Sequence, residues 1–228
     1  MMENVIELKG VEKTYHIDDH ELKILKKTSL SIKKGEFVAI VGPSGSGKST
    51  LMHIMGALDR PTHGEVWIDG KNIAKLSDNE LAHIRNKKIG FVFQSFNLMN
   101  KLTALENVML PMWFGGRNDS STKERATTLL KQMGLGHRME HYPLKMSGGE
   151  RQRVSIARSL SNSPSIILAD EPTGNLDSKT GEAIMKILKD INKSGTTLII
   201  VTHDLNIAST AQKRIVIRDG EIVKGGKT

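Results

Sequence analysis

Apolar and polar residues change their spacing several times along this chain of 228 residues. Near the start, NVIELKGV (4–11) and TSLSIKKGEFVAIV (28–41) alternate or run apolar, which predicts β-strands. A further segment, GEVWIDGKNI (64–73), carries Asp69 and Gly70 between two candidate strands, a pair that favours a tight hairpin turn. The first third of the chain is therefore expected to hold an antiparallel β layer.

The middle of the chain, from about Ser95 to Ser163, has the spacing of helices. In TKERATTLLKQMGL (122–135), apolar residues recur about every 3.6 positions, and a glycine stands near the end, where helices often stop. Before this segment, GGRNDSST (115–122) has the composition of a surface loop. We interpret the region as a set of helices inserted between two parts of one core.

In the last third, short apolar strands alternate with a helix. The segments SIILAD (165–170) and TTLIIVTHD (196–204) predict buried strands, and KTGEAIMKILKDINKSG (179–195) between them predicts an amphipathic helix. Continuous apolar strands separated by helices indicate a parallel sheet that is covered on both faces.

The pattern as a whole predicts one α/β domain spanning residues 1–228. Its core, a mainly parallel sheet with an antiparallel β layer, is expected from residues 1–94 and 164–228. The helical subdomain is expected from about residues 95–163.

Composition limits the kinds of function open to the chain. It has no cysteine, which excludes disulfides, thiolate chemistry and cysteine-held metal clusters. The formal net charge of +8 fits a solvated basic surface, attraction to phosphate-bearing ligands, or attraction to an anionic membrane face. Aromatic residues make up only 4% and the basic residues are dispersed, so no nucleic acid partner is expected. We see no secretion signal at the N-terminus, and no apolar run approaches the roughly 20 residues of a membrane span.

Glycines and a lysine fill GPSGSGKST, which follows the apolar strand FVAIV (37–41) and precedes the apolar segment LMHIMGAL (51–58). It fits the G-x-x-x-x-G-K-[ST] pattern of a phosphate loop, in the strand–loop–helix context that the pattern requires. Glycines let successive N–H groups point into one concavity, and the following helix adds the positive end of its dipole. The candidate nucleotide-binding residues of this loop are Gly42, Pro43, Ser44, Gly45, Ser46, Gly47, Lys48, Ser49 and Thr50.

Each polar residue of the phosphate site has an expected role toward ATP and Mg²⁺. Lys48 can reach the β- and γ-phosphates, the Ser49 hydroxyl can ligate Mg²⁺, and Thr50 can assist at the α-phosphate. A carboxylate on a neighbouring strand is needed to orient the metal, and Asp170 ends the apolar strand IILAD. Glu171 follows at once and is the candidate that polarises an attacking water.

Two more apolar strands end in polar residues. Gln94, in FVFQS, has a side-chain oxygen that can ligate Mg²⁺ or hold the water, and His203, after LIIVT, can hydrogen-bond the γ-phosphate. Tyr15 is a candidate for stacking on a base, although a half-buried strand tyrosine explains it nearly as well.

The phosphate loop, Gln94, MSGGE (146–150), IILADE, GNLD and His203 together resemble the ATP-binding subunit of an ABC transporter, over essentially the whole chain and in the family's order. The resemblance implies the fold of an ABC ATPase, ATP hydrolysis, and Mg²⁺ as cofactor. MSGGE corresponds to the family's signature, usually LSGGQ. Met146 replaces leucine, which is a mild apolar exchange, and Glu150 replaces glutamine, which adds a charge near the nucleotide.

The resemblance also implies a second copy of the chain as partner. In the family, two subunits meet head to tail, and the signature of one covers the γ-phosphate held by the other. It therefore implies nucleotide contacts from Ser147, Gly148, Gly149 and Glu150. From the residues alone, Ser147 and Glu150 also form the pattern of a helix capping box, and both interpretations can hold together.

Two further implications concern neighbouring segments. TGNLD resembles the loop that crosses the dimer interface, so Asp177 is expected to shape the partner's water site. The family passes motion to a membrane permease through a groove near the Gln94 loop. A cluster of large apolar residues lies there, mostly as expected helix core: Phe96, Leu98, Met99, Met109, Met112, Trp113 and Phe114.

The sequences of residues 91–111 and 168–182 resemble those of one branch of the family, the lipoprotein-releasing and macrolide-exporter-like branch. This resemblance implies a separate transmembrane permease and a cytoplasmic location, peripheral on the inner face of the membrane. A soluble ABC ATPase not coupled to transport, such as an iron–sulfur assembly ATPase subunit, is the main alternative. A regulatory subunit without turnover is a third alternative. The presence of four candidate site residues argues against it: Lys48, Asp170, Glu171 and His203.

Overall fold

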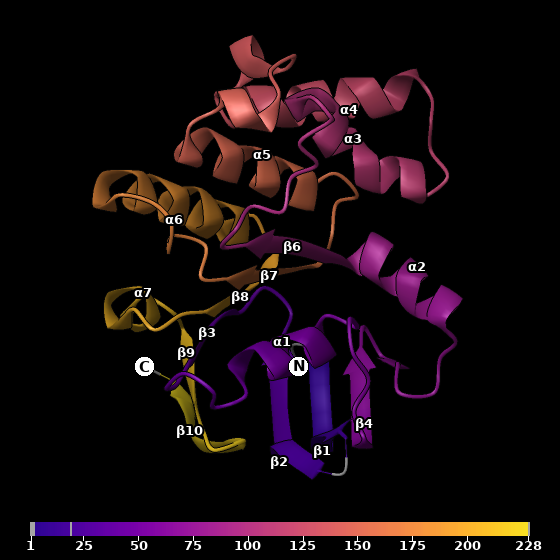
Figure 1. Ribbon diagram of the computed structural model, residues 1–228, viewed down its shortest axis with the longest axis vertical. Helices are drawn as coiled ribbons and strands as arrows, with labels where there is room; N and C mark the ends of the chain where they lie inside the picture. The colour runs from indigo at the N-terminus through magenta and orange to yellow at the C-terminus, as the bar shows by residue number, and fades with distance from the viewer. Residues whose placement is uncertain (1–2, 19, 228) are drawn as a thin grey trace.

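The computed structural model describes residues 3–18 and 20–227 (Figure 1). Its strands are β1 (Asn4–Ile17), β2 (His20–Lys33), β3 (Phe37–Val41), β4 (His63–Ile68), β5 (Lys71–Asn72), β6 (Ile89–Phe93), β7 (Ile166–Asp170), β8 (Thr197–Val201), β9 (Lys213–Arg218) and β10 (Glu221–Lys227). Its helices are α1 (Lys48–Met55), α2 (Asp78–Lys88), α3 (Ala104–Phe114), α4 (Ser120–Gln132), η1 (Gly136–Arg138), η2 (Pro143–Lys145), α5 (Gly148–Ser159), α6 (Ser178–Lys193) and α7 (Leu205–Ser209).

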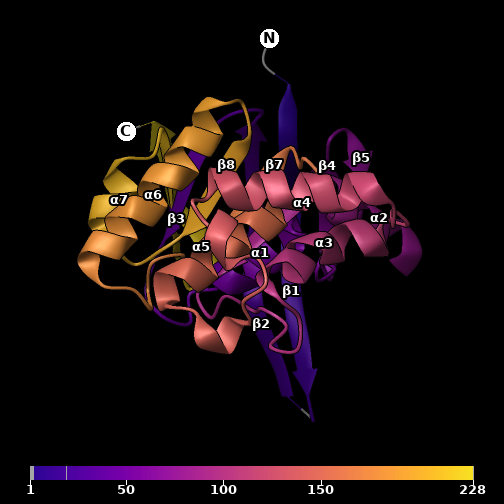
Figure 2. The same cartoon turned by 90° about the horizontal axis from the view of Figure 1, so that it is seen from above.

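The antiparallel layer expected near the N-terminus is confirmed. A four-stranded sheet runs in the order β2-β1-β4-β5, and its paired strands are antiparallel. Asp69 and Gly70 turn the chain between β4 and β5 with positive φ angles of 48° and 76°, the region that such a tight turn needs. The β1–β2 hairpin extends beyond the rest of the molecule in Figure 2.

The parallel sheet is also confirmed. The six-stranded sheet has the order β10-β9-β3-β8-β7-β6, and all neighbouring pairs from β9 to β6 are parallel. Only β10 pairs antiparallel with β9. Every residue of β3 and β8 is buried, as their continuous apolar sequences predict for strands covered on both faces.

Alternate residues of the parallel strands feed two different hydrophobic clusters. Ala39 and Ile200 belong to a cluster with residues of α3, α4, α5 and α6, whereas Val38 and Ile199 pack with residues of α1 and the antiparallel sheet. Figure 1 shows the same order in space, with helices α3 to α6 above the parallel sheet and α1 with the β1–β2–β4 layer below it. The sheet edge that carries the candidate site therefore lies between two layers of cover.

Between β6 and β7 the described chain forms only helices and loops, in agreement with the helical spacing of that region. Helix α3 packs on α4 and α5, and α5 also contacts β6 and α6. The division into core and subdomain at residues 95 and 163 stays a prediction. Among the described residues, no helix is long and apolar enough to cross a membrane.

Two local expectations need correction. The predicted loop at residues 115–122 is wrong for its last three residues, because Asp119 caps α4 by accepting a hydrogen bond from the backbone N–H of Thr122. Helix α2 was not predicted at all. It buries only Leu81 and Ile84, so its apolar periodicity is weak.

Candidate ATP-binding and hydrolysis site

The phosphate loop leaves β3 and enters α1, and packing forces its glycines. A Cβ at Gly42 would lie 2.1 Å from the carbonyl oxygen of Ile217. Gly47 has φ 100°, and a Cβ there would lie 3.0 Å from the carbonyl oxygen of Ile24. Side chains at either position would push the loop away from β2 and β9, so glycine is required here by the fold as well as by phosphate chemistry.

Helix α1 starts without a side-chain cap. Its N-cap is Gly47, in the left-handed region, and no side chain accepts from its first N–H groups. Those donors and the helix dipole are therefore available to an anion. The Lys48 ammonium donates to the carbonyl oxygens of Gly42 (2.9 Å) and Pro43 (2.8 Å), which places its charge over the same loop.

Strand register brings the other predicted residues to one edge. Val201 of β8 is level with Ile40 of β3 and with Asp170 of β7, and Asp170 is level with Phe93 of β6. The residues that follow these strands, including Gln94 and His203, therefore leave the sheet at the same carboxyl edge as the phosphate loop. In open α/β sheets this edge is where ligands bind.

Glu171 and His203 contact each other directly. A Glu171 Oε1 atom lies 2.8 Å from His203 Nδ1 and accepts a hydrogen bond from the His203 backbone N–H at 3.1 Å. Glu171 has a positive φ of 44°, which is uncommon for a residue with a side chain and often marks a functional site. Its side chain is 19% exposed, against 77% for His203. A carboxylate and an imidazole are thus paired at the site's rim.

Asp170 has the surroundings of a cation ligand. Burial raises the pKa of its carboxyl group, and the neighbouring Glu171 carboxylate raises it further, while His53 and Lys48 act in the opposite direction. Among the described residues, no hydrogen bond or ion pair engages this carboxylate. A half-buried carboxylate in that state fits Mg²⁺, which prefers oxygen ligands and needs few from the protein when phosphates supply the rest.

Gln94 is held by a residue that the sequence did not indicate. Its amide nitrogen donates to the side-chain oxygen of Asn175 (3.3 Å), and the Asn175 amide donates to the Gln94 carbonyl oxygen (3.0 Å). A Cβ on Gly174 would lie 2.6 Å from the Gln94 amide nitrogen, so the turn packs tightly on this side chain. Since the Gln94 side chain uses only its amide nitrogen in these bonds, its side-chain oxygen remains free to bind a metal or to accept from a water.

The serine–glycine run begins α5, with Ser147 as N-cap. The Ser147 hydroxyl accepts from the Glu150 backbone N–H at 3.2 Å, and the Glu150 carboxylate accepts from the Ser147 backbone N–H at 2.9 Å. The capping box is therefore present. Arg138 donates to the same carboxylate at 3.0 Å, so the charge that Glu150 adds is partly neutralised within the chain.

The glycines of the run pack against the TGNLD loop and against the start of α6. A Cβ on Gly149 would lie 2.5 Å from Cγ2 of Thr180, and one on Gly148 would lie 3.2 Å from Leu176. Asp177 caps α6, because its carboxylate accepts from the backbone N–H and hydroxyl of Thr180, at 3.0 Å and 2.6 Å. None of these described contacts reaches the phosphate loop of the same chain.

Comparison with known proteins identifies the family. The family model described as ABC transporter matches residues 25–174. The chain belongs to the ABC transporter family. It is 51% identical to an uncharacterized ABC transporter ATP-binding protein of Thermotoga maritima, over 97% of this chain and 94% of that protein.

Two other relatives add information on assembly. The macrolide export ATP-binding/permease protein MacB of Escherichia coli is 50% identical over 97% of this chain, which spans 34% of MacB. A solved dimeric structure of the ATP-binding cassette MJ0796, in a post-hydrolysis state bound to ADP and Pi, has a TM-score of 0.90 at 50% identity. That match covers 97% of this chain and 98% of the other. The predicted ABC ATPase fold and family are thereby confirmed, while the roles of single residues stay predictions.

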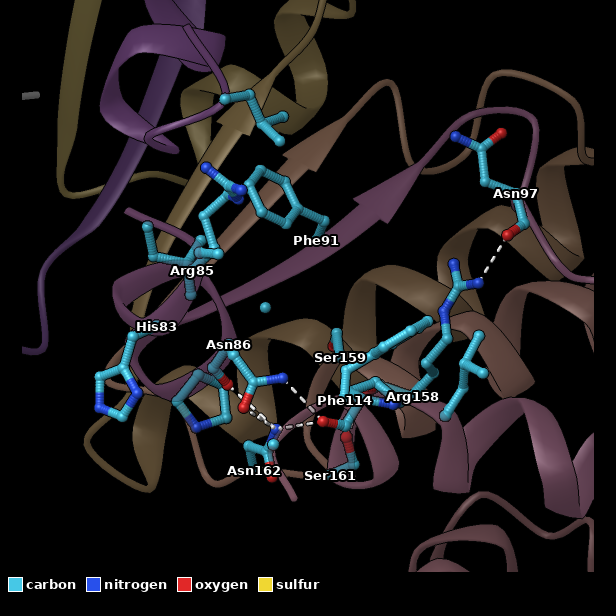
Figure 3. Close-up of a pocket in the computed structure, with 18 of the residues that line it drawn as sticks. His83, Arg85, Asn86, Phe91, Asn97, Phe114, Arg158, Ser159, Ser161 and Asn162 are labelled. Carbon is cyan, nitrogen blue, oxygen red and sulfur yellow. Dashed lines mark hydrogen bonds between the residues drawn. The ribbon is translucent and has the colours of Figure 1, made fainter. Parts of the chain in front are cut away.

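A groove of this ABC chain is lined by side chains of α2, β6 and the ends of α3 and α5 (Figure 3). It has a volume of about 720 Å³ and lies between α2, β6 and the end of α3. Phe114, which lines it, is 80% exposed, and Met99, in the loop between β6 and α3, is 53% exposed. The other members of the predicted apolar cluster are at least partly covered: Phe96, Leu98, Met109, Met112 and Trp113.

Basic groups line the groove. Burial lowers the pKa of the Arg158 guanidinium to about 10, and this side chain donates to the carbonyl oxygens of Phe96 and Asn97. Arg85 donates to the carbonyl oxygen of Ala57 at 2.6 Å. None of the described residues that line the groove is acidic.

Proposed function

We propose that this chain is the ATP-hydrolysing subunit of an ABC transporter and acts as a head-to-tail homodimer on a separate membrane permease. One observation carries the proposal. The phosphate loop, Asp170, the Glu171–His203 pair and Gln94 converge on one sheet edge, whereas the signature run lies on α5 and contacts α6 instead. Each chain thus offers one cradle and one lid that do not meet.

The chemistry follows from the residues at that edge. The open N-terminus of α1 and Lys48 bind the phosphates and offset their charge. Glu171 can accept a proton from the attacking water, and His203, paired to it, keeps the carboxylate oriented.

Magnesium supplies charge stabilisation at the β- and γ-phosphates when it is bound. Ser49, Asp170 and Gln94 would hold it. No group of at least three His, Cys, Asp or Glu side chains among the described residues forms a metal cage. That agrees with a metal held largely by nucleotide oxygens.

Dimerisation is supported by the signature's position and by the dimeric MJ0796 cassette. The capping box satisfies the N–H of Glu150. Gly148 is half-buried and Gly149 is buried against Thr180, but their N–H groups, which are the first of the helix, have no intrahelical acceptor. Those donors and the Ser147 hydroxyl are suited to the γ-phosphate that the partner copy holds. Asp177 is proposed to shape the water site of the partner copy. Tyr15 is proposed to stack on the base of ATP.

A permease partner is supported by the relative whose name joins ATP-binding and permease parts in one protein. In this chain the groove beside Phe114 is proposed to receive the permease. The proposed location is accordingly peripheral, at the inner face of a membrane. The macrolide-exporter-like and lipoprotein-releasing branch is the proposed subclass. Purification of a tagged chain from its host in detergent should bring down a multi-pass membrane protein with the native chain and with Leu205→Ser, and less of it with Phe114→Ser. If only soluble partners come down, the chain is a soluble ABC ATPase instead.

Glu171→Gln tests the hydrolysis and the dimer together. The variant should bind ATP normally, hydrolyse it about a hundredfold or more slowly, and form a stable dimer with ATP in light scattering. Glu124→Gln, on the exposed face of α4, is the matched control and should behave as the native chain. An ATP-bound Glu171→Gln monomer, or turnover per chain that does not fall on dilution to single chains, would refute the shared site.

A further inference from the structure

A compact polar cluster surrounds the ring of Tyr15, outside the phosphate loop. The Tyr15 hydroxyl donates to Asp59 Oδ2 at 2.7 Å. The Lys13 ammonium donates to Asp59 Oδ1 at 2.6 Å and lies 4.7 Å from the centre of the Tyr15 ring. The phenol is therefore held at its hydroxyl and covered on one face.

The strand itself is shaped to aim these side chains. The pairing of β1 with β2 shifts register between Val11 and Lys13 and again between Lys13 and Thr14. Such bulges bend a strand and redirect its side chains. On a regular strand, two residues that are two positions apart share one face but do not normally contact the same third residue. Here the bulges allow both Lys13 and Tyr15 to reach Asp59.

Asp59 links the ring to the phosphate loop. It lies shortly after α1, the helix that starts at Lys48, and its Oδ1 also accepts from the backbone N–H of Arg60 at 2.7 Å. Lys13 donates in addition to the Arg60 carbonyl oxygen at 2.8 Å. The ring on β1 and the helix of the phosphate loop are thus joined by a hydrogen-bonded bridge of two side chains and one peptide.

The charge states agree with a fixed arrangement. Burial alone would raise the pKa of the Asp59 carboxyl group, but hydrogen bonds from Lys13, Tyr15 and the Arg60 N–H outweigh it and hold the pKa below its usual value. Burial and the hydrogen bond to Asp59 raise the pKa of Tyr15, against a smaller opposing contribution from Thr50. At neutral pH the phenol is a donor and the carboxylate an ionised acceptor.

We propose that Asp59 and Lys13 are positioning residues, which hold the Tyr15 ring at a set place above the phosphate loop as the platform for the adenine base of ATP. Lys13 covers one face of the ring, so the base stacks on the opposite face. The inference rests on the proposed nucleotide site and adds to it the groups that place the base relative to the phosphates. A platform held from α1 keeps the base at a fixed place relative to the triphosphate.

Binding of two ligands, one with a base and one without, distinguishes effects on the Tyr15 platform from effects on the phosphate loop. Isothermal titration would use ATP and inorganic tripolyphosphate, which has no base, with native, Tyr15→Ala, Asp59→Ala and doubly substituted chains. Loss of one stacked base should weaken ATP binding about tenfold in Tyr15→Ala. Asp59→Ala and Lys13→Met should weaken it about three- to tenfold, because the ring remains but is no longer held. Tripolyphosphate should bind all of them as it binds the native chain.

The double substitution is decisive, because a positioning residue acts only through the residue it positions. Asp59→Ala should add nothing to Tyr15→Ala. In turnover assays KM for ATP should rise while kcat changes by less than about twofold, and Lys13→Arg should restore most of the loss of Lys13→Met. Glu12→Ala is the matched control, since Glu12 pairs with Lys23 across the same two strands and touches neither Tyr15 nor Asp59.

Each other outcome counts against a specific claim. Equal and additive effects of Asp59→Ala with and without the Tyr15 ring would overturn the positioning role. An equal loss of tripolyphosphate affinity would show that Asp59 supports the phosphate loop rather than the base. ATP binding that survives Lys48→Ala unchanged would instead refute the nucleotide site itself, whatever happens at Asp59.

Discussion

The two helix N-termini of the candidate site, at α1 and α5, are built differently. Helix α1 begins at Gly47 with no side-chain cap, and its first N–H groups are open to a ligand. Helix α5 begins at Ser147 with a complete capping box, so part of its first turn is already satisfied within the chain. This difference fits the proposal that the first terminus receives phosphate directly, whereas the second keeps its shape until the partner copy covers it.

The glycines of the two motifs differ in the same sense. In the phosphate loop, Gly42 and Gly47 let the backbone lie against β9 and β2. In the signature, Gly149 lets α5 lie against Thr180 at the start of α6. Both sets of glycines are needed for packing inside the chain, so glycine content alone does not show which motif meets a ligand. The open helix terminus and the converging strand ends are the features that favour the phosphate loop as the ligand-binding motif.

Lys48→Ala should have the largest effect, because it removes the cation that is proposed to bind phosphate within a single chain. ATP binding in titration should fall below detection, and hydrolysis should drop by more than about a hundredfold. Lys34→Ala, an exposed lysine between β2 and β3, is the control and should change neither. Unchanged ATP affinity in Lys48→Ala would mean that the phosphate loop does not bind the phosphates of ATP. The proposed difference in function between the N-termini of α1 and α5 would then fail.

Ser147→Arg should distinguish ATP binding by the single chain from closure of the dimer. A bulky cation at the start of α5 should block closure of the dimer and lower turnover by about a hundredfold, while single chains still bind ATP within about threefold of the native affinity. Light scattering with ATP should show monomers. Ser120→Arg, at the start of α4, should leave turnover intact, and normal turnover in Ser147→Arg would remove the signature from the site. Loss of the cap should also cost about 1 kcal/mol of folding stability, which thermal unfolding would measure separately.

Gly149→Ala should test the packing role alone. The new Cβ would meet Cγ2 of Thr180 at 2.5 Å, so we expect a loss of about 1–3 kcal/mol in the free energy of unfolding by urea. Thr180→Ser removes that methyl group but keeps the hydroxyl that bonds to Asp177, so it should restore most of the loss. A Cβ at Gly136 would lie 3.4 Å from Cγ of Lys131 and 3.9 Å from Cε of Met139, both in flexible side chains, which makes Gly136→Ala the control. Failure of Thr180→Ser to rescue Gly149→Ala would place the strain elsewhere.

The comparison also explains which parts of the molecule could be predicted from sequence. The phosphate loop and the sheet were predictable because local pattern determines them: β3 and β8 are continuous apolar runs, and Gly42 and Gly47 stand at fixed spacing before Lys48. The convergence of Asp170 and Gln94 followed from the rule that parallel strands end at one edge.

Contacts between distant segments were not predictable. Asn175 holds Gln94 across 81 residues, and Asp59 holds Tyr15 across 44, and nothing local to either segment signals the pairing. Helix α2 was missed because it buries two side chains only, although the Ser77–Glu80 capping box that starts it is a readable signal. For the apolar cluster, sequence could not tell the buried Met112 from the exposed Phe114, since both lie near the end of one helix.

Glu150→Gln should give the smallest effect, and it tests the departure from the family signature. The backbone N–H of Ser147 holds the pKa of Glu150 below its usual value, against burial, with further help from Arg138. A lowered folded-state pKa stabilises the chain above the unfolded value of about 4.3, and this contribution disappears as pH falls through the folded pKa. Glutamine keeps the acceptor for Ser147 but loses the charge that pairs with Arg138, so it should cost about 0.5 kcal/mol at pH 7 and nothing once the native carboxyl is protonated. Urea unfolding across pH 3–7 measures the difference in unfolding free energy between the native chain and Glu150→Gln. A difference that stays constant down to pH 3 would show that the charge of Glu150 does not stabilise α5.

Turnover of Glu150→Gln should stay within about twofold of the native value, because Arg138 already offsets that charge in the native chain.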